Sequence, residues 1–378
     1  PARAKETLPD SKERMAAADA ELAVLTKERD TIVASSAYEV AYGVSEGTPV
    51  NARVQKRGEP DKPGDEVPRR FLEVLGGDEV SQPAAGSGRR ELAEWLTRPS
   101  NPLTARVFVN RVWQWHFGRG LVATSSDFGT RGELPSHPEL LDWLAARFMK
   151  TGWDVKSLHR TIMLSRTYQL SSDDHEGNLQ RDPTNVLLWR FSRQALDAES
   201  IRDSILAVSG MLDPTVPREH PFPPVDQWAF TIHQPFYATY DSQHRSVYLM
   251  LQRNRRHPFL SAFDAADPNQ SVAERLPTIT PTQSLYLMNS PFVHQASAAF
   301  ASLLIKDEGN PEARIRKALQ LANGRPPESA DIAEAMEFLR DYQSRLQAIA
   351  ASGHDPEAEA WSAFARVVLT SNAFLFVD

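Results

Sequence analysis

In several places this 378-residue chain carries a short capping side chain directly before a proline, and four of these pairs stand before a predicted helix. They are Asn101-Pro102, Ser290-Pro291, Asn310-Pro311 and Asp355-Pro356. Asn, Ser and Asp side chains accept hydrogen bonds from the free backbone N–H groups at a helix start. Proline suits the first helical position because it has no N–H to leave unpaired. The pairs therefore predict where several helices begin and favour a mainly α-helical chain.

Other helix-end signals agree. Ser136 with Glu139, and Thr280 with Gln283, have the spacing of a capping box. Glycines, which readily take the left-handed angles that stop a helix, stand at positions 118, 152, 210 and 324. We expect a mainly α, multi-helix globular domain. Its predicted helices span residues 11–34, 89–97, 102–117, 137–150, 155–168, 194–209, 281–289, 291–305, 311–322, 330–349 and 357–370.

The predicted non-helical parts are few. Residues 37–44 and 50–57 alternate between apolar and polar types around the turn SEGTP, which predicts a small N-terminal β-hairpin. Residues 245–251 are a further strand candidate. Residues 211–243 form a long proline-rich irregular segment, which we expect to be ordered against the core because it is too long for a plain connector. The expected domains are a helical connector over 1–36, a hairpin and extended linker over 37–82, and a helical domain over 83–378.

The predicted helix at 11–34 has an apolar repeat of seven. Met15 and Leu22 are seven residues apart, as are Ala18, Leu25 and Ile32. Two heptads are too few for a stable coiled coil, so we expect this helix to pack on a neighbouring domain. The chain does not begin with methionine, which suggests a fragment whose partners include upstream domains of the same protein.

Composition excludes several functions. A net charge of −7 argues against nucleic-acid binding, which needs a basic face. No apolar run approaches the roughly 20 residues of a membrane-spanning helix. The chain has no cysteine, so it cannot attach haem c or hold an iron–sulfur cluster or thiolate zinc. Phosphate-loop, dinucleotide, HExxH and GxSxG motifs are also missing. We therefore expect no metal or cofactor in this chain.

His116 is the first candidate for chemistry. It falls within the apolar half of the helix at 102–117, near its C-terminal end. There a histidine could act as a general base in an apolar environment of low dielectric constant. It could equally be a core residue that bonds the last carbonyls of the helix, and we favour that interpretation.

The loop at 118–137 is the second candidate, because loops of about twenty residues tend either to carry function or to be disordered. Gly118, Gly120, Gly129 and Gly132 allow close backbone approach. Arg131 and Asp127 could orient an anionic or sugar-like ligand, or they could form a clasp that closes the loop. As a site, the region would use the catalytic residues His116, Asp127 and His137 and the ligand-binding residues Arg119, Arg131 and Glu133.

Three weaker candidates lie further along the chain. Arg255 and Arg256 belong to a basic cluster that could bind phosphate or sulfate, although pairing with the nearby aspartates is favoured. Glu199 and Asp203 are four apart and could share a metal, but ordinary ion pairs are favoured. Trp228, in the irregular segment, could stack on a sugar.

The chain resembles a known family over residues 89–378. The matching blocks include ELAEWLTRPSNPLTARVFVNRVWQWHFGRGLV, DFGTRGELPSHPELLDWLA, ALDAESIRDSILAVSGMLDP and TPTQSLYLMNSPFVHQAS. They are similar to the planctomycete-specific C-terminal domain of large exported proteins that also carry a planctomycete cytochrome C domain. The resemblance implies a periplasmic or secreted location and a c-type haem in an upstream domain. It implies no particular activity.

Two functions remain open. The first is a non-catalytic interaction or assembly module, which predicts a sizeable exposed apolar patch on the helix at 11–34 or on the segment at 211–243. The alternative is an enzyme acting on a polysaccharide or another anionic polymer, with oxidative chemistry conceivable and its site in the loop at 116–137. That alternative requires the candidate side chains to line one pocket within hydrogen-bond reach.

Overall fold

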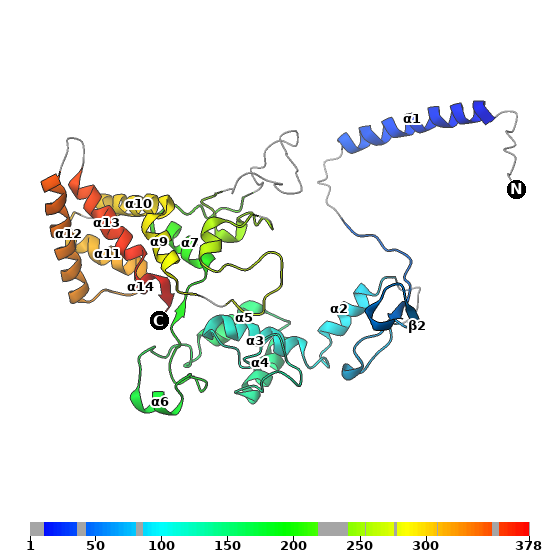
Figure 1. Ribbon diagram of the computed structural model, residues 1–378, viewed down its shortest axis with the longest axis horizontal. Coiled ribbons are helices and arrows are strands. Elements are labelled where there is room, and N and C mark those ends of the chain that lie inside the picture. The colour runs from blue at the N-terminus through cyan, green and yellow to red at the C-terminus, as the bar shows by residue number, and fades with distance from the viewer. Residues whose placement is uncertain are drawn as a thin grey trace. The chain divides into compact units, whose positions relative to one another are not determined.

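The computed structural model describes residues 11–35, 43–80, 86–217, 241–253, 255–275, 278–307, 309–349 and 355–377 (Figure 1). The chain divides into two compact units, Pro1–Arg98 and Pro99–Asp378. The described residues are mainly helical, and the N-terminal unit contains an antiparallel hairpin, so the predicted fold class is confirmed. None of the described helices is long and apolar enough to cross a membrane.

The N-terminal unit holds two helices and the hairpin. Helix α1 spans Ser11–Ser35 and helix α2 spans Arg89–Thr97. Strands β1, Ala52–Gln55, and β2, Pro63–Val67, pair antiparallel with Ala52 opposite Val67. The hairpin prediction was right, but its second strand comes from residues that we expected to be a loop. The other predicted strand, 37–44, lies largely outside the described residues.

Three helices form a first core in the C-terminal unit. They are α3, Thr104–Phe117; α4, Pro138–Lys150; and α5, Val155–Met163. Their inward faces contribute Val109, Val112, Trp113, Leu144 and Ile162, all almost completely buried. Residues Leu121 and Val122 of the loop that follows α3 are buried in the same core. Hydrophobic burial therefore holds one end of this loop against the helices.

A second core is formed by α7, Ala198–Val208; α8, Pro258–Ala262; α9, Pro281–Asn289; α10, Pro291–Asp307; α11, Pro311–Asn323; α12, Ser329–Ile349; α13, Pro356–Leu369; and α14, Asn372–Leu375. The short helix α6, Glu176–Arg181, buries none of its residues. Helices α10 and α13 pack closely (Figure 1). Phe300 and Trp361 lie fully buried in this second core. Strand β3, Gln194–Ala195, pairs with β4, Phe376–Val377, which fastens the chain's last residues to the start of α7.

Three of the predicted side-chain caps are present among the described residues, whereas α3 begins after Leu103 without a side-chain cap, not after Asn101. Thr280 and Gln283 form the expected capping box, and Asn310 and Asp355 accept backbone N–H groups at the starts of α11 and α13. The Ser136–Glu139 box was wrong. Helix α4 begins after His137, with no side-chain cap. The Ser136 hydroxyl instead donates to the carbonyl of Leu121, within the loop.

Three helix and strand boundaries differ from the prediction. The helix expected over 155–168 ends at Met163, since residues 165–168 form a turn in which Tyr168 N–H donates to the Ser165 hydroxyl. The helix expected over 194–209 begins only at Ala198, because residues 194–195 form a strand. The strand expected over 245–251 was wrong: Ser246–Tyr248 is a 3₁₀ turn. Most of the segment at 211–243 lies outside the described residues.

Candidate functional site

The loop at 118–137 is tied to α3 by Asn110, a completely buried residue. The Asn110 amide nitrogen donates to the carbonyl of Val122 at 3.0 Å, and its oxygen accepts the N–H of Val122 at 2.8 Å. Ser125 donates to the side chain of Gln114 at 2.7 Å, also in the interior. These bonds satisfy backbone groups that burial would otherwise leave unpaired. The loop is therefore packed over the first core at this end.

The middle of the loop closes on itself. The Thr124 hydroxyl donates to the carbonyl of Asp127 at 2.8 Å and accepts the N–H of Glu133 at 2.9 Å. The carboxylate of Asp127 accepts the N–H of Gly129 at 2.9 Å. The backbone is crowded here: a Cβ on Gly132 would lie 2.0 Å from the Asp127 carbonyl oxygen. Glycine at 132 is required by this close approach rather than by a positive φ.

Replacing Gly132 with alanine is therefore expected to destabilise the protein by about 2 kcal/mol, as overpacking of a closed site does. Urea unfolding of the full chain measures the loss. Gly129→Ala is the matched control in the same loop, because its nearest contact is a flexible carboxylate oxygen at 3.2 Å. Equal losses in the two variants would show that the crowding at Gly132 has no effect on stability.

The charged residues of the loop do not converge. Arg119 reaches Glu133 at 3.4 Å, and both side chains are about half exposed. Arg131 is exposed and forms no ion pair with Asp127, whose carboxylate bonds the backbone instead. His137 is half-buried, with its Nδ1 3.0 Å from the hydroxyl of Ser136. Among the described residues, no hydrogen bond or ion pair joins any two of His116, Asp127 and His137.

His116 pairs instead with a histidine that sequence reasoning did not single out. Its Nε2 lies 2.7 Å from Nδ1 of His159 on α5, and the edge of Tyr168 packs against its ring. One ring must donate and the other accept, so a doubly protonated pair cannot keep this bond. Burial, and then the nearby His159, lower the pKa of His116 below its usual value. The backbone carbonyl of His116 accepts from Gln194.

This pKa shift gives the pair a pH dependence. A histidine with a lowered pKa in the folded state binds protons more readily when unfolded, so stability falls as pH drops below the unfolded value of about 6.5. We expect urea unfolding to show a larger loss of stability between pH 8 and pH 5 for the wild type than for His116→Gln. Identical pH profiles for the two proteins would contradict this account of the pair.

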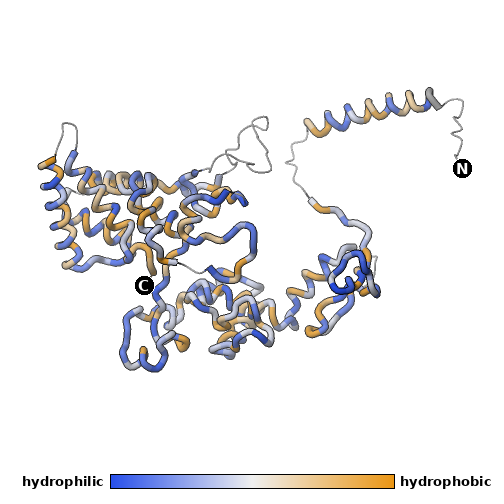
Figure 2. The backbone as a smooth tube through the Cα atoms, in the orientation of Figure 1, coloured by the Kyte–Doolittle hydropathy of each residue, from blue (hydrophilic) through white to orange (hydrophobic). Residues whose placement is uncertain are grey.

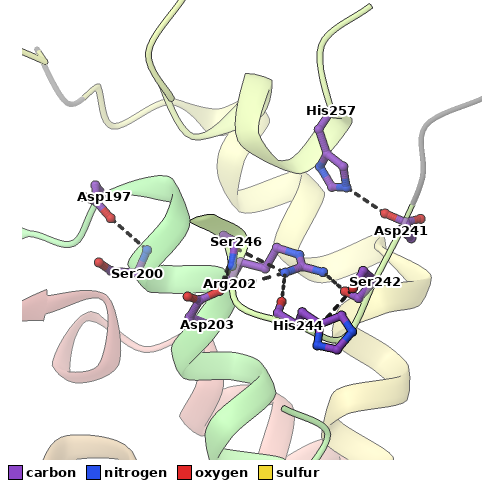
Figure 3. Close-up of polar contacts among 9 residues, drawn as sticks. All are labelled: Asp197, Ser200, Arg202, Asp203, Asp241, Ser242, His244, Ser246 and His257. Carbon is purple, nitrogen blue, oxygen red and sulfur yellow. Dashed lines mark hydrogen bonds and ion pairs between the residues drawn. The ribbon is translucent and has the colours of Figure 1, made fainter. Parts of the chain in front are cut away.

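A dense polar cluster lies elsewhere, between α7 and residues 241–257 (Figure 3). Arg202 of α7 is almost fully buried. Its guanidinium donates to the carbonyl of His244 and the hydroxyl of Ser246, each at 3.2 Å, and to the carbonyl of Ser242. Burial lowers the pKa of Arg202, and the charge of Asp203 opposes that shift. Arg202 therefore fastens residues 242–246 to α7.

Asp203 completes the attachment. One of its carboxylate oxygens accepts both the N–H and the hydroxyl of Ser246, each at 2.7 Å. The same oxygen lies 3.9 Å from the guanidinium of Arg202, so the two neighbouring charges hold the same segment. Asp203 thus has a structural role, and it does not share a ligand with Glu199, which pairs with Arg275 at 2.6 Å. This agrees with the ion-pair interpretation of both residues.

His257, like His244 in the same cluster, has a buried ring nitrogen without a hydrogen-bond partner. Its Nε2 lies 2.7 Å from a carboxylate oxygen of Asp241, whose side chain is exposed (Figure 3). The other ring nitrogen, Nδ1, is buried without a hydrogen-bond partner. The pair thus couples a buried imidazole to a surface carboxylate.

The other candidates have local partners or cannot be placed. Arg256 pairs with Asp267, as the favoured interpretation expected, and Arg255 is exposed. Trp228 lies outside the described residues. No group of three or more His, Asp or Glu side chains among the described residues is arranged to hold a metal ion.

Comparison with protein families gives one match. The PSD1 family, described as a protein of unknown function (DUF1553), matches residues 88–339, more than half of the chain. The chain belongs to the PSD1 family. Comparison with curated proteins and with solved structures gave no match. The matched region of this PSD1 protein includes the loop at 118–137 and the whole Arg202 cluster, whereas α1 precedes it.

Sequence reasoning missed Arg202 and His159 in this PSD1 protein. Arg202 stands four residues after Ala198 on the buried face of α7, and a cation at an apolar helix position was the available signal. His159 gave no comparable signal, because its partner His116 is 43 residues away in the chain and only the packing of α3 on α5 brings the two rings together.

Proposed function

We propose that this chain is a non-catalytic interaction module of an exported, multidomain, cytochrome-associated protein, and that α1 is the surface through which it binds a helix. The exported and cytochrome-associated context rests on the family resemblance of the sequence. The binding role rests on one observation, the exposed apolar row of α1. The polar groups of the loop at 118–137 and of the Arg202 cluster bond largely within the chain. Neither region therefore offers a second surface for partners.

The apolar row of α1 follows the spacing of a helix-pairing seam. Met15, Leu22, Leu25 and Ile32 are separated by steps of seven, three and seven, and each is at least 54% exposed. Figure 2 shows apolar residues interspersed with hydrophilic ones along the helix. Burying each of these side chains against a partner would contribute about 1.5 kcal/mol or more. Most of the stability of a helix in a protein comes from packing of one of its faces, so a partner would also stabilise α1 itself.

Site-specific photo-crosslinking in cells that make the full-length protein tests this proposal. A benzophenone amino acid replaces Leu25 on the row, and in a matched control it replaces Val24, which is 65% exposed but faces away from the row. We expect position 25 to crosslink to a peptide that belongs to a helix of the partner, and we expect a much lower yield from position 24. Equal yields at both positions, or none at either, would contradict the proposal.

An enzyme acting on a polysaccharide or another anionic polymer is the second candidate function. One observation favours it: the buried, unpartnered Nδ1 of His257, whose ring is bonded to Asp241. An imidazole hydrogen-bonded to a carboxylate is the arrangement in which catalytic triads orient their general base. Incubation with pectate, alginate and sulfated polysaccharides, followed by size analysis of the polymer, tests this candidate. It requires cleavage that disappears in His257→Gln and persists in Arg245→Gln, an exposed neighbour.

A further inference from the structure

We propose that the partner of α1 is α1 of a second copy of this chain, and that the two helices run antiparallel. This inference rests on the proposed function, because it names the helix that α1 binds. It replaces the sequence-based expectation that α1 packs on a neighbouring domain, because the seam of α1 matches a second copy of itself in size and charge. The sizes and charges of the residues along the exposed row favour a second copy of α1 as the helix that covers it.

The seam of α1 contains Met15, Ala18, Leu22, Leu25, Arg29 and Ile32. A twofold axis between Leu22 and Leu25 would face Leu22 with Leu25 of the partner subunit. The same register faces Met15 with Ile32 of the partner subunit, and Ala18 with Arg29 of the partner subunit. Every layer then pairs two large apolar side chains or one large side chain with a small one, as close packing between helices requires.

Arg29 decides between the two directions. In a parallel, in-register pair Arg29 would face Arg29 of the partner subunit, placing two like charges in the seam. In the antiparallel pair it faces Ala18 of the partner subunit, the smallest apolar side chain in the seam. Its aliphatic stem can then lie along the apolar layer while the guanidinium reaches solvent at the edge.

The charges beside the seam complement this position of Arg29. Glu21 and Glu28 each precede a seam residue, and the antiparallel register brings Glu28 near Glu21 of the partner subunit. The guanidinium of Arg29 pairs with Asp30 in the structure, and both side chains are exposed. In the antiparallel pair it would turn toward the two glutamate carboxylates. The cation then offsets a repulsion that would otherwise oppose the pair. A helix of unrelated sequence would offer this match of charge and size only by chance.

The absence of cysteine from the chain allows a direct test of direction. Leu22→Cys and Leu25→Cys variants of the full chain are purified, mixed in equal amounts and oxidised gently. The antiparallel pair predicts that the 22–25 mixed disulfide exceeds the 22–22 and 25–25 products about fivefold or more, because only facing residues meet the short separation a disulfide needs. Val24→Cys with either variant should give little product.

Each other outcome overturns the inference. Dominant 22–22 and 25–25 disulfides would mean a parallel pair. No disulfide above the Val24→Cys background, with a monomeric mass at all concentrations, would exclude a second copy. If photo-crosslinking from position 25 then captured another polypeptide, the proposed function would stand while the self-pairing inference failed. As a further check, Arg29→Glu should weaken dimerisation about tenfold or more, whereas Lys27→Glu, on the outer face, should change it little.

Discussion

Asn110→Ala is expected to lower the free energy of unfolding by about 3 kcal/mol, one of the two largest effects that the structure predicts. The substitution leaves the N–H and the carbonyl of Val122 buried without partners. An unsatisfied buried polar group costs about 1–3 kcal/mol, and the variant creates two of them. Urea unfolding at neutral pH, followed by circular dichroism, measures the loss.

Arg111→Ala is the matched control for this variant. Arg111 is the next residue of α3 and is exposed, so its replacement should change stability by no more than about 0.5 kcal/mol. Hydrogen exchange should also become faster in residues 118–137 of the Asn110 variant, because the loop has lost the two hydrogen bonds that join Val122 to α3. A loss below about 1 kcal/mol would mean that the loop is held mainly by Leu121 and Val122.

Arg202→Met is expected to destabilise the protein by about 3 kcal/mol. The change keeps much of the apolar stem but removes every hydrogen bond from the guanidinium to residues 242–246. It also leaves the carboxylate of Asp203 without its neighbouring cation. Breaking one side of a buried charged network typically costs a few kcal/mol. Arg202→Lys should lose less, since an ammonium group can still donate to some of the same acceptors.

Two measurements distinguish a local role of Arg202, in holding residues 242–246, from a general contribution to the stability of the C-terminal unit. Arg245→Met, at an exposed arginine beside the cluster, should leave stability within about 0.5 kcal/mol of the wild type. Hydrogen exchange in Arg202→Met should increase first at residues 242–249. Uniform loosening of the whole C-terminal unit, with no early change there, would argue against a clamp between α7 and this segment.

The sequence predicted most of the helices because their signals are local. Caps such as Thr280 with Gln283, and Asp355 before a proline, act within one helical turn, so they survive whatever the rest of the fold does. The prediction failed where a distant contact competes with a local one. Ser136 has the spacing of a capping residue, yet its hydroxyl bonds the carbonyl of Leu121 on the other side of the loop.

Interpreting the candidate site from sequence was harder for the same reason. His116 looked like a lone histidine, because His159 reaches it only through the packing of two helices. The charges of the loop at 118–137 suggested a converging site, but Thr124 and Asp127 bond the loop's own backbone. The apolar repeat of α1, by contrast, is a periodic pattern, and its exposure in the structure matches the surface that an interaction module requires.

Amide hydrogen exchange of residues 11–35 tests the central claim most directly, because a helix whose apolar row is buried exchanges slowly and an uncovered one frays. The full chain, at concentrations where it associates, should protect these amides. Leu22→Glu should abolish the protection, and Val24→Glu, on the other face, should retain it. Exchange in the wild type as fast as in an unstructured peptide, or the same protection in all three proteins, would contradict the assignment of α1 as the binding surface.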